Sequence, residues 1–227
     1  MALTSAMQDY LAEAYRLANY HGEQQPVTTS ALADVLGVSA PAVTRMVQRL
    51  KDAGYLVHEP YRGVALTVDG EREALKSIRR HRLVERFLTD VMAFGWHEVH
   101  DAADSLGAVV SETVVERMAD LAGHPARCPH GEPIPSADGV MPIVRDFPLI
   151  EATPNVPLKV SRVNSHDAEK LRYLDSLGMV TGADFKLIER APFNGPLKLL
   201  IRGDTHFIGH ELARVLRVCL PEDFDLA

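Results

Sequence analysis

The chain has 227 residues, of which 46% are hydrophobic and 24% charged, the composition of an ordinary globular protein. One hydrophobic core of about 100–150 residues would leave a remainder, so we expect more than one domain. The formal net charge of −7 argues against a protein that coats nucleic acid nonspecifically, but it allows a DNA reader with locally clustered basic residues.

The sequence lacks the signals of membrane insertion and export. No run of about 18 apolar residues occurs, so no membrane span is expected. The first residues, MALTSAMQDYLAEAY, have no basic stretch followed by an apolar segment and do not resemble a secretory signal. Cys128 and Cys219 are too few for a disulfide framework and favour a reducing cytoplasm.

The N-terminal region begins with helical patterns. Residues 7–20 carry an apolar stripe at helical spacing, and the segment HGEQQP at 21–26 interrupts it. A short helix follows, for which Thr29 or Ser30 is the expected cap. Gly37 then falls where a tight helix-to-helix turn needs a positive φ.

The next segments complete the order of a winged helix-turn-helix. Ser39 is expected to cap a second helix that has Pro41 in its first turn, where proline is tolerated. Residues 55–70 alternate in polarity around Arg62 and Gly63, which predicts a two-stranded hairpin, the wing.

The second of these helices is the candidate DNA reader. The N-terminal residues of such a helix reach base edges in the major groove, and Arg45 suits a bidentate contact with guanine. Ser39, Arg49 and Arg62 are better placed for phosphates, which position a protein without specifying sequence. The alternative is a small helical subdomain with surface arginines. The candidate DNA-contacting residues are Ser39, Pro41, Ala42, Arg45, Gln48, Arg49 and Arg62.

The remainder of the chain divides into a helical part and a β-rich part. Helices are predicted from Asp69 to about Met92, from about His97, and from Ser111 through Leu121. Residues 139–157 are rich in proline and resemble a linker. The last part has short β-rich runs with one helical interruption at 167–177, which predicts a small five-stranded barrel.

Two pairs of potential metal ligands lie four residues apart: His81 with Glu85, and His100 with Asp104. Residues at i and i+4 share a face of a helix, so each pair points two ligand-type side chains in one direction. Imidazole, thiolate and carboxylate donors together suit Mn(II), Fe(II), Co(II) or Zn(II) rather than calcium. Further candidates are Asp9, Cys128, His130, His166 and Glu169.

A plainer interpretation exists for each of these residues. Four arginines surround the first pair, and a His–Glu pair in that setting is usually a solvated salt-bridge face. The remaining histidines of the second half, in a turn and in the barrel, are expected at the surface. These are His124, His206 and His210.

Seven stretches carry a resemblance to a known family. They are QDYLAEAYRL, LADVLGVSAPAVTRMVQRL, LTVDGE, RRHRLVERFL, VHDAAD, CPHGEPIP and LRYLDSLGMVTG. In this order they resemble the diphtheria-toxin-repressor/manganese-transport-regulator family over nearly the whole chain. The resemblance implies a cytoplasmic, metal-activated bacterial repressor of metal-uptake genes that binds palindromic operator DNA as a homodimer, with Mn(II) favoured and Fe(II) possible, and Zn(II) or Co(II) as substitutes in vitro.

The resemblance also implies a domain plan. A mainly α winged helix-turn-helix would occupy residues 1–75, and a helical metal-binding and dimerisation domain residues 76–140. A linker at 141–156 would lead to an all-β, SH3-like barrel of the FeoA type at 157–227.

The family pattern divides the ligands into an ancillary site and an activating site. Asp9 stands where iron-type members have methionine, which favours the harder Mn(II), although Cys128 pulls the other way. Asp9 on the first helix would let the metal set the angle between domains. The ancillary set is His81, Glu85, His100, His166 and Glu169. The activating set is Asp9, Asp104, Cys128 and His130.

One segment departs from the family pattern. Members usually have Leu-Glu-His-x-x-Ser where this chain has LGAVVS at 106–111, so Gly107 and Ala108 replace ligands. Ala12 likewise stands where short manganese regulators have Glu. We therefore expect the site centred on His81 to be the main one.

Two other functions compete with the metal-activated regulator. The first is a winged-helix regulator with a non-metal effector, in which the histidines are structural. The second is a small metallohydrolase built on the two ligand pairs, but no HExxH motif occurs and the helix-turn-helix would have no role. We expect no enzyme activity, no small-molecule substrate and no membrane partner.

Overall fold

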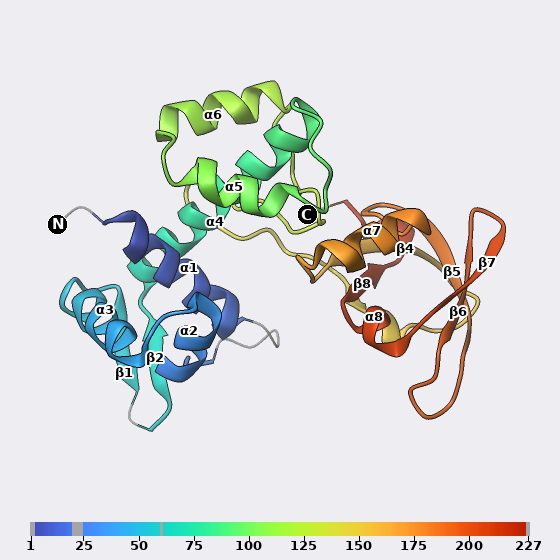
Figure 1. Cartoon of the computed structure of the whole chain (residues 1–227), viewed down its shortest axis with the longest axis horizontal. Helices are drawn as coiled ribbons and strands as arrows, with labels where there is room; N and C mark the ends of the chain where they lie inside the picture. Colours follow the sequence, from blue (N-terminus) through green and yellow to red (C-terminus); the bar gives the residue numbers. More distant parts are fainter. Residues whose placement is uncertain (1–2, 20–24, 60, 226–227) are drawn as a thin grey trace. The chain divides into compact units, whose positions relative to one another are not determined.

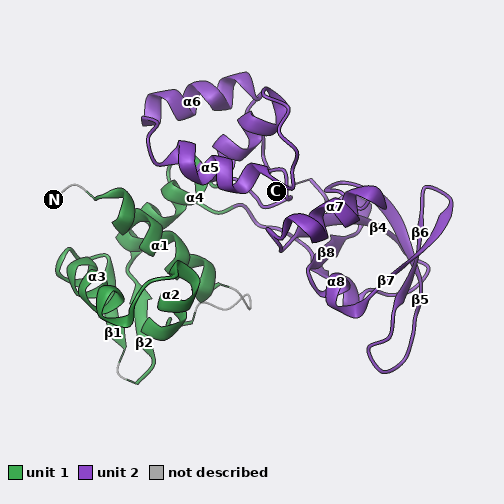
Figure 2. Ribbon diagram, in the orientation of Figure 1, with its two compact units in different colours: residues 1–80, 135–141 green, residues 81–134, 142–227 purple. Residues whose placement is uncertain are grey.

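The computed structural model describes residues 3–19, 25–59 and 61–225, so residues 21–24 of the predicted break at 21–26 lie outside the described residues. The chain forms two compact units (Figure 2), one of residues 1–80 and 135–141 and one of residues 81–134 and 142–227. No helix in the described ranges is long and apolar enough to cross a membrane.

The first unit is a winged helix-turn-helix, as predicted (Figure 1). Three helices precede a two-stranded antiparallel wing, and α4 then leads out of the unit. The elements are α1 (Ser5–Ala18), α2 (Thr29–Leu36), α3 (Ala40–Asp52), β1 (Leu56–Glu59), β2 (Gly63–Leu66) and α4 (Val68–Asp90).

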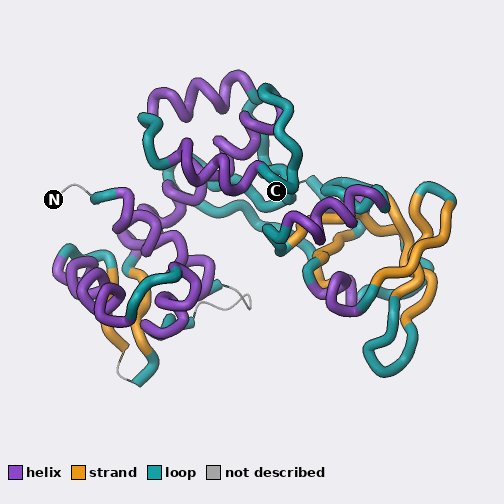
Figure 3. Tube along the Cα trace, in the orientation of Figure 1, coloured by secondary structure: helices purple, strands orange, loops and turns teal. Residues whose placement is uncertain are grey.

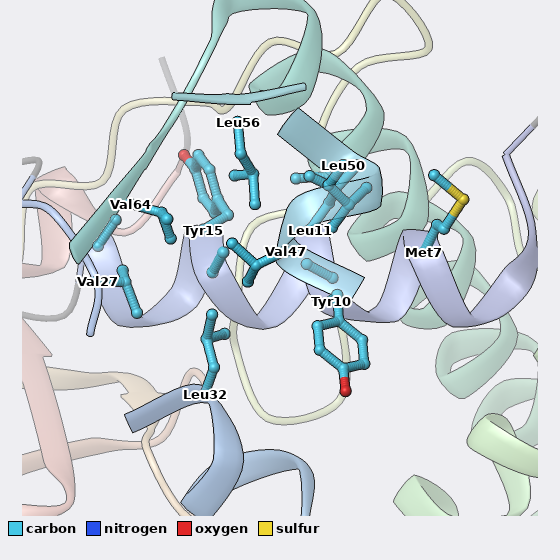
Figure 4. Close-up of a cluster of buried hydrophobic side chains, with 14 of the residues drawn as sticks. Met7, Tyr10, Leu11, Tyr15, Val27, Leu32, Val47, Leu50, Leu56 and Val64 are labelled. Carbon is cyan, nitrogen blue, oxygen red and sulfur yellow. The ribbon is translucent and has the colours of Figure 1, made fainter. Parts of the chain in front are cut away.

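Apolar residues from all of these elements form one core (Figure 4). Leu11 of α1, Leu32 of α2 and Leu50 of α3 are each at most 1% exposed, and Leu56 and Val64 of the wing join them. On α1 the buried positions recur three or four residues apart, so one face of the helix is apolar. This packing leaves the opposite side of α3 at the surface.

The turn between α2 and α3 has the predicted backbone, but the caps differ in detail. Gly37 has a φ of 63°, as the tight turn requires. Thr28, rather than Thr29 or Ser30, caps α2, because its hydroxyl accepts the Ala31 amide at 3.1 Å. Ser39 occupies the N-cap of α3, but its side chain makes no capping hydrogen bond.

The second unit begins with the remainder of α4, followed by α5 (Val99–Gly107) and α6 (Glu112–Leu121). Val84, Val99 and Val115, one from each helix, are completely buried in a shared core. A loop at 126–134 follows and closes on itself through an isolated bridge between Arg127 and Pro133. α4 runs without interruption through the predicted domain boundary at 75/76.

An antiparallel sheet of six strands, with the order β3-β8-β4-β5-β6-β7, completes this unit. Its strands are among the segments drawn in orange in Figure 3. The predicted helical interruption is α7 (Ala168–Ser176), and a further short helix is α8 (His210–Arg214). The strands are β3 (Phe147–Pro148), β4 (Pro157–Val163), β5 (Asp184–Arg190), β6 (Leu197–Ile201), β7 (Asp204–Ile208) and β8 (Leu216–Cys219). Short 3₁₀ turns are η1 (Leu149–Glu151) and η2 (Pro221–Asp223).

The predicted count of five strands was wrong by one, and the predicted linker at 141–156 was too long. Phe147 pairs with Val218, and Leu149 is completely buried in the barrel core. The Asp146 side chain is 1% exposed and accepts hydrogen bonds from Arg162 and Arg217. Prolines made this segment resemble a linker, but proline is tolerated in an edge strand, and β3 is one of the two edge strands of this sheet.

Replacing Asp146 by asparagine should destabilise the barrel by about 3 kcal/mol at neutral pH, because two guanidinium groups would lose their buried carboxylate. Burial alone would raise the pKa of Asp146, but hydrogen bonds and charge from Arg162 and Arg217 hold that pKa below its usual range. The contribution is therefore present above the unfolded-state pKa and lost as pH falls through the folded-state pKa. Urea unfolding followed by the fluorescence of Trp96, the sole tryptophan, which packs against the barrel core, measures the loss.

A matched control is Asp184→Asn. Asp184 pairs with Lys159 at 2.9 Å but is 75% exposed, so its loss should change stability by less than about 1 kcal/mol. Equal effects of the two substitutions, or an Asp146 effect that does not shrink in acid, would show that the buried ion pairs do not hold this segment.

Candidate metal centre

The candidate ligands of the second unit come from two helices and one loop. His81 and Glu85 are one turn apart on α4 and share a face, as their spacing predicts. His100 lies in the first turn of α5. Cys128 and His130 lie in the loop at 126–134 and are almost completely buried. Side chains from three separate segments therefore meet around Glu85.

Three donor atoms converge within hydrogen-bond distance of one another. Glu85 Oε1 lies 3.1 Å from His81 Nε2 and 3.1 Å from His100 Nδ1, and the two nitrogens are 3.2 Å apart. Two neighbouring ligands that each lie about 2.1 Å from one ion and at right angles are about 3 Å apart. The spacing of these three atoms therefore fits a shared transition-metal ion.

In His81 and His130, the ring nitrogen that faces away from Glu85 contacts a hydrogen-bond acceptor. His81 Nδ1 lies 3.0 Å from Asp104 Oδ1, and His130 Nε2 donates to the Trp96 carbonyl oxygen at 2.7 Å. A metal-binding histidine typically donates its second N–H to a carboxylate or a carbonyl, which fixes the tautomer and the ring orientation. The arrangement at His81 and His130 follows this pattern.

His130 Nδ1 is the clearest sign of a ligand position. Because Nε2 donates to a carbonyl, Nδ1 of neutral His130 carries a lone pair. This nitrogen is buried, has no hydrogen-bond partner among the described residues, and lies 3.7 Å from Glu85 Oε1. A buried polar atom without a partner costs free energy, and a bound cation would satisfy it.

Cys128 adds a sulfur donor beside Glu85 and His130. Ligand atoms of Glu85, Cys128 and His130 all lie within 4.8 Å of one another. Burial, and next the negative charge of Glu85, raise the pKa of the Cys128 thiol well above its ordinary value. Coordination to a metal ion deprotonates a thiol outright, so the thiolate would form together with the bound metal.

The charges in the cluster show how strongly Glu85 depends on positive neighbours. Burial alone would raise the pKa of Glu85, but hydrogen bonds from His100 and His81, together with the neighbouring His130 imidazole, hold that pKa well below its ordinary value. Burial opposes the charge of His81 as well, but Asp104 and Glu85 raise its pKa to about 9. In this state a proton on imidazole balances the buried carboxylate, and a divalent ion can take over that role.

The barrel brings one of its two predicted ligands to the cluster. The His166 ring stacks on the His100 ring with 3.6 Å between centroids. The side chain of His166 is exposed, and desolvation by its neighbours, followed by the charges of His100 and His130, lowers its pKa below the ordinary value. Glu169 is exposed in the first turn of α7, and neither His166 nor Glu169 belongs to a group of potential ligands among the described residues.

The predicted division into two ligand sets differs from the observed grouping. Cys128 and His130 gather with Glu85, and Asp104 gathers with His81 and His100. Asp9 is exposed on α1 of the first unit. Gly107 is the last residue of α5 and Ala108 follows it. Neither residue type has a side chain that can bind a metal. Sequence reasoning missed the Trp96 carbonyl, because no side-chain pattern marks a backbone acceptor.

The candidate DNA-contacting residues lie on the outer side of α3 and on the wing. Val43, Val47 and Leu50 hold the inner side of α3 in the core. Gln48 donates to Asp52 at 2.7 Å, and Arg62 donates to Glu59 at 3.1 Å. All seven candidates are exposed except Ala42, which is partly buried; the exposed ones are Ser39, Pro41, Arg45, Gln48, Arg49 and Arg62.

Three family models match consecutive parts of the chain. The N-terminal DNA-binding domain of iron-dependent repressors matches residues 2–64, and their metal-binding and dimerisation domain matches residues 67–136. The FeoA domain matches residues 147–219. The matches follow the order of the winged helix, the helices and the barrel.

Individual relatives match over most of their length. The iron-dependent repressor IdeR of Mycobacterium tuberculosis is 30% identical over 220 residues, covering 91% of this chain and 95% of the relative. The diphtheria toxin repressor of Corynebacterium diphtheriae is 27% identical over 221 residues, with the same coverage. A solved manganese-dependent transcriptional repressor in complex with manganese is 33% identical, with a TM-score of 0.85 over 94% of this chain and 99% of the other. The chain therefore belongs to the diphtheria-toxin-repressor/manganese-transport-regulator family of metal-dependent transcriptional repressors.

Proposed function

We propose that this protein is a cytoplasmic repressor of metal-uptake genes that binds palindromic operator DNA when it has bound Mn(II), or alternatively Fe(II). The observation that carries the proposal is the convergence of His81 Nε2, Glu85 Oε1 and His100 Nδ1 within 3.2 Å of one another. The orphaned His130 Nδ1 beside them supports the same site.

The donor set of this site fits a transition metal. His81, Glu85, His100, His130 and Cys128 would hold the ion, and Asp104 would orient His81 from outside. Imidazole nitrogens with one carboxylate and one thiolate suit Mn(II), Fe(II), Co(II) or Zn(II). The ion would supply the positive charge that the buried carboxylate requires. For the second site that the resemblance implies, Asp9 in place of methionine would favour Mn(II). Among the relatives, one solved structure is bound to manganese and the mycobacterial repressors are named iron-dependent.

The DNA contacts would come from the exposed side of α3 and from the wing. We assign Arg45 to a guanine edge, since the first turns of a recognition helix enter the major groove. Arg49 and Ser39 would contact phosphates. Arg62 would leave its ion pair with Glu59 and contact a phosphate instead. The free-energy cost of breaking this pair is small, because an exposed ion pair contributes at most about 1 kcal/mol.

A homodimer would explain the exposed apolar residues of α6 and of the turn before it. Val109, Val114 and Leu121 are exposed in the segment that matches the family's dimerisation domain. Exposed apolar residues gathered in one region often mark an interface. A twofold dimer places two recognition helices about one DNA turn apart, which requires a palindromic operator.

DNA binding should depend on the metal. In a fluorescence-anisotropy titration with DNA from the protein's own promoter region, Mn(II) or Fe(II) should strengthen binding and a chelator should abolish that gain. The conformations competent for DNA would be favoured only when Glu85 and its neighbours hold the ion. Equal affinity in metal and in chelator would favour a regulator with a non-metal effector.

Replacing Glu85 by glutamine should weaken Mn(II) binding by at least about 100-fold, since this carboxylate is the shared neighbour of all three histidines and even outer-shell residues contribute 10–100-fold. Isothermal titration of the full chain measures the change. Glu169→Gln is the matched control and should retain wild-type affinity. The assignment fails if Glu85→Gln binds normally, and a loss in Glu169→Gln would restore Glu169 as a ligand.

Asp9 is the predicted ligand on α1. Asp9→Ala should reduce the metal-induced gain in DNA affinity while leaving metal binding at the Glu85 cluster largely intact, because only DNA binding would require a ligand from the DNA-binding domain. Anisotropy and metal titrations of one preparation separate the two effects. An unchanged metal response of DNA binding would remove Asp9 from the switch.

A further inference from the structure

The loop that carries Cys128 and His130 is held mainly by the barrel. The Thr181 hydroxyl donates to the Pro129 carbonyl oxygen at 2.9 Å, and the Val163 amide donates to the His130 carbonyl oxygen at 2.9 Å. Gly131 has a φ of 89°, and a Cβ there would lie 2.1 Å from the Ser161 carbonyl oxygen. The barrel strand β4 thus passes directly against the loop.

Glu132 connects this loop to both of its neighbours. Its carboxylate accepts from Arg82 Nη2 at 3.0 Å and from Arg162 Nη1 at 3.3 Å. Its carbonyl oxygen accepts the Cys128 amide at 2.8 Å and thereby closes the turn. Arg82 follows His81 directly on α4, whereas Arg162 lies on β4. One side chain therefore ties the ligand loop to the helix with His81 and Glu85 and to the barrel.

The two arginines are themselves held in place. Arg162 directs Nε and Nη2 to Asp146 at 2.6 and 2.9 Å, which leaves Nη1 for Glu132. Arg82 also donates to the Pro133 carbonyl oxygen. The side chains of Arg82, Glu132 and Arg162 are 10%, 25% and 21% exposed, so these charge-assisted hydrogen bonds are largely shielded from water.

We propose that Glu132 is a positioning residue of the metal centre, which fixes Cys128 and His130 relative to His81 and Glu85 and makes docking of the barrel a determinant of metal affinity. This inference rests on the proposed metal site. Glu132 belongs to neither group of potential ligands, so it acts through the loop. Without its charge, Arg82 and Arg162 would face one another with no carboxylate between them, and the loop would lose its link to α4.

The test is a Co(II) titration of the full chain that follows the thiolate-to-cobalt charge-transfer band, which reports Cys128 as a ligand. Glu132→Ala should lower Co(II) affinity by about 10–100-fold and weaken the band per bound ion, as loss of outer-shell support does at other metal sites. Glu132→Gln keeps the size and one acceptor oxygen and should lie between Glu132→Ala and the wild type. Asp184→Asn, which removes an exposed barrel carboxylate, should match the wild type.

Thermal unfolding of the metal-free variants separates positioning from general stability. A lowered unfolding temperature with wild-type affinity and an unchanged band would overturn the proposal, because Glu132 would then only stabilise the fold. The proposal would also be overturned if Glu132→Ala kept the wild-type Co(II) affinity, the wild-type charge-transfer band and the wild-type unfolding temperature. If the wild-type chain itself bound no Co(II), the proposed metal site would fail and the positioning role with it.

Discussion

The second unit is organised around one buried carboxylate. Glu85 is 2% exposed and has His81, His100 and His130 within 3.7 Å of its Oε1 atom. An ionised carboxylate without a positive partner in such a place would cost several kcal/mol. The imidazoles, and in the proposed function a divalent ion, supply that partner. α4, α5 and the ligand loop, which pack together through a shared apolar core, each bring a nitrogen atom to this oxygen.

The barrel has a direct part in this arrangement. It presents His166 to His100, and β4 and Thr181 bind the loop that carries Cys128 and His130. The chain of contacts from Asp146 through Arg162 to Glu132 and Arg82 reaches the residue next to His81. The C-terminal domain and the candidate metal centre therefore share one network of charged side chains, so a change in one is expected to alter the other.

Local patterns in the sequence predicted the local structure well. The helical stripe of α1, the positive φ at Gly37 and the shared face of His81 and Glu85 each depend on residues close in sequence, and each is found. Elements fixed by distant contacts were harder to predict. Strand β3 has only two residues, one of them proline, and its pairing with β8 depends on a segment about seventy residues away.

The grouping of the ligands shows the same limit. Residue types and the family resemblance placed His81, Glu85 and His100 in one set, and their contacts agree with that grouping. The same reasoning assigned Cys128, His130 and Asp104 to a separate set, which the contacts do not reproduce. His130 reaches Glu85 because the loop closes on itself and is held by β4, contacts that no spacing in the sequence reveals. Asp104 lies one helical turn after His100 on α5, and its carboxylate contacts Nδ1 of His81, the nitrogen that faces away from Glu85. The residues of the predicted activating set therefore do not lie in one group: Cys128 and His130 lie beside Glu85, Asp104 lies beside His81, and Asp9 belongs to the first unit.

The most direct test of the metal centre is anomalous scattering from crystals of the full-length protein soaked in Mn(II). We predict a peak at bonding distance from Glu85 Oε1, His81 Nε2 and His100 Nδ1, with His130 Nδ1 among the ligands. A peak found only on the Asp104 side of His81, or no peak near Glu85, would contradict the assignment of Glu85 as the central ligand.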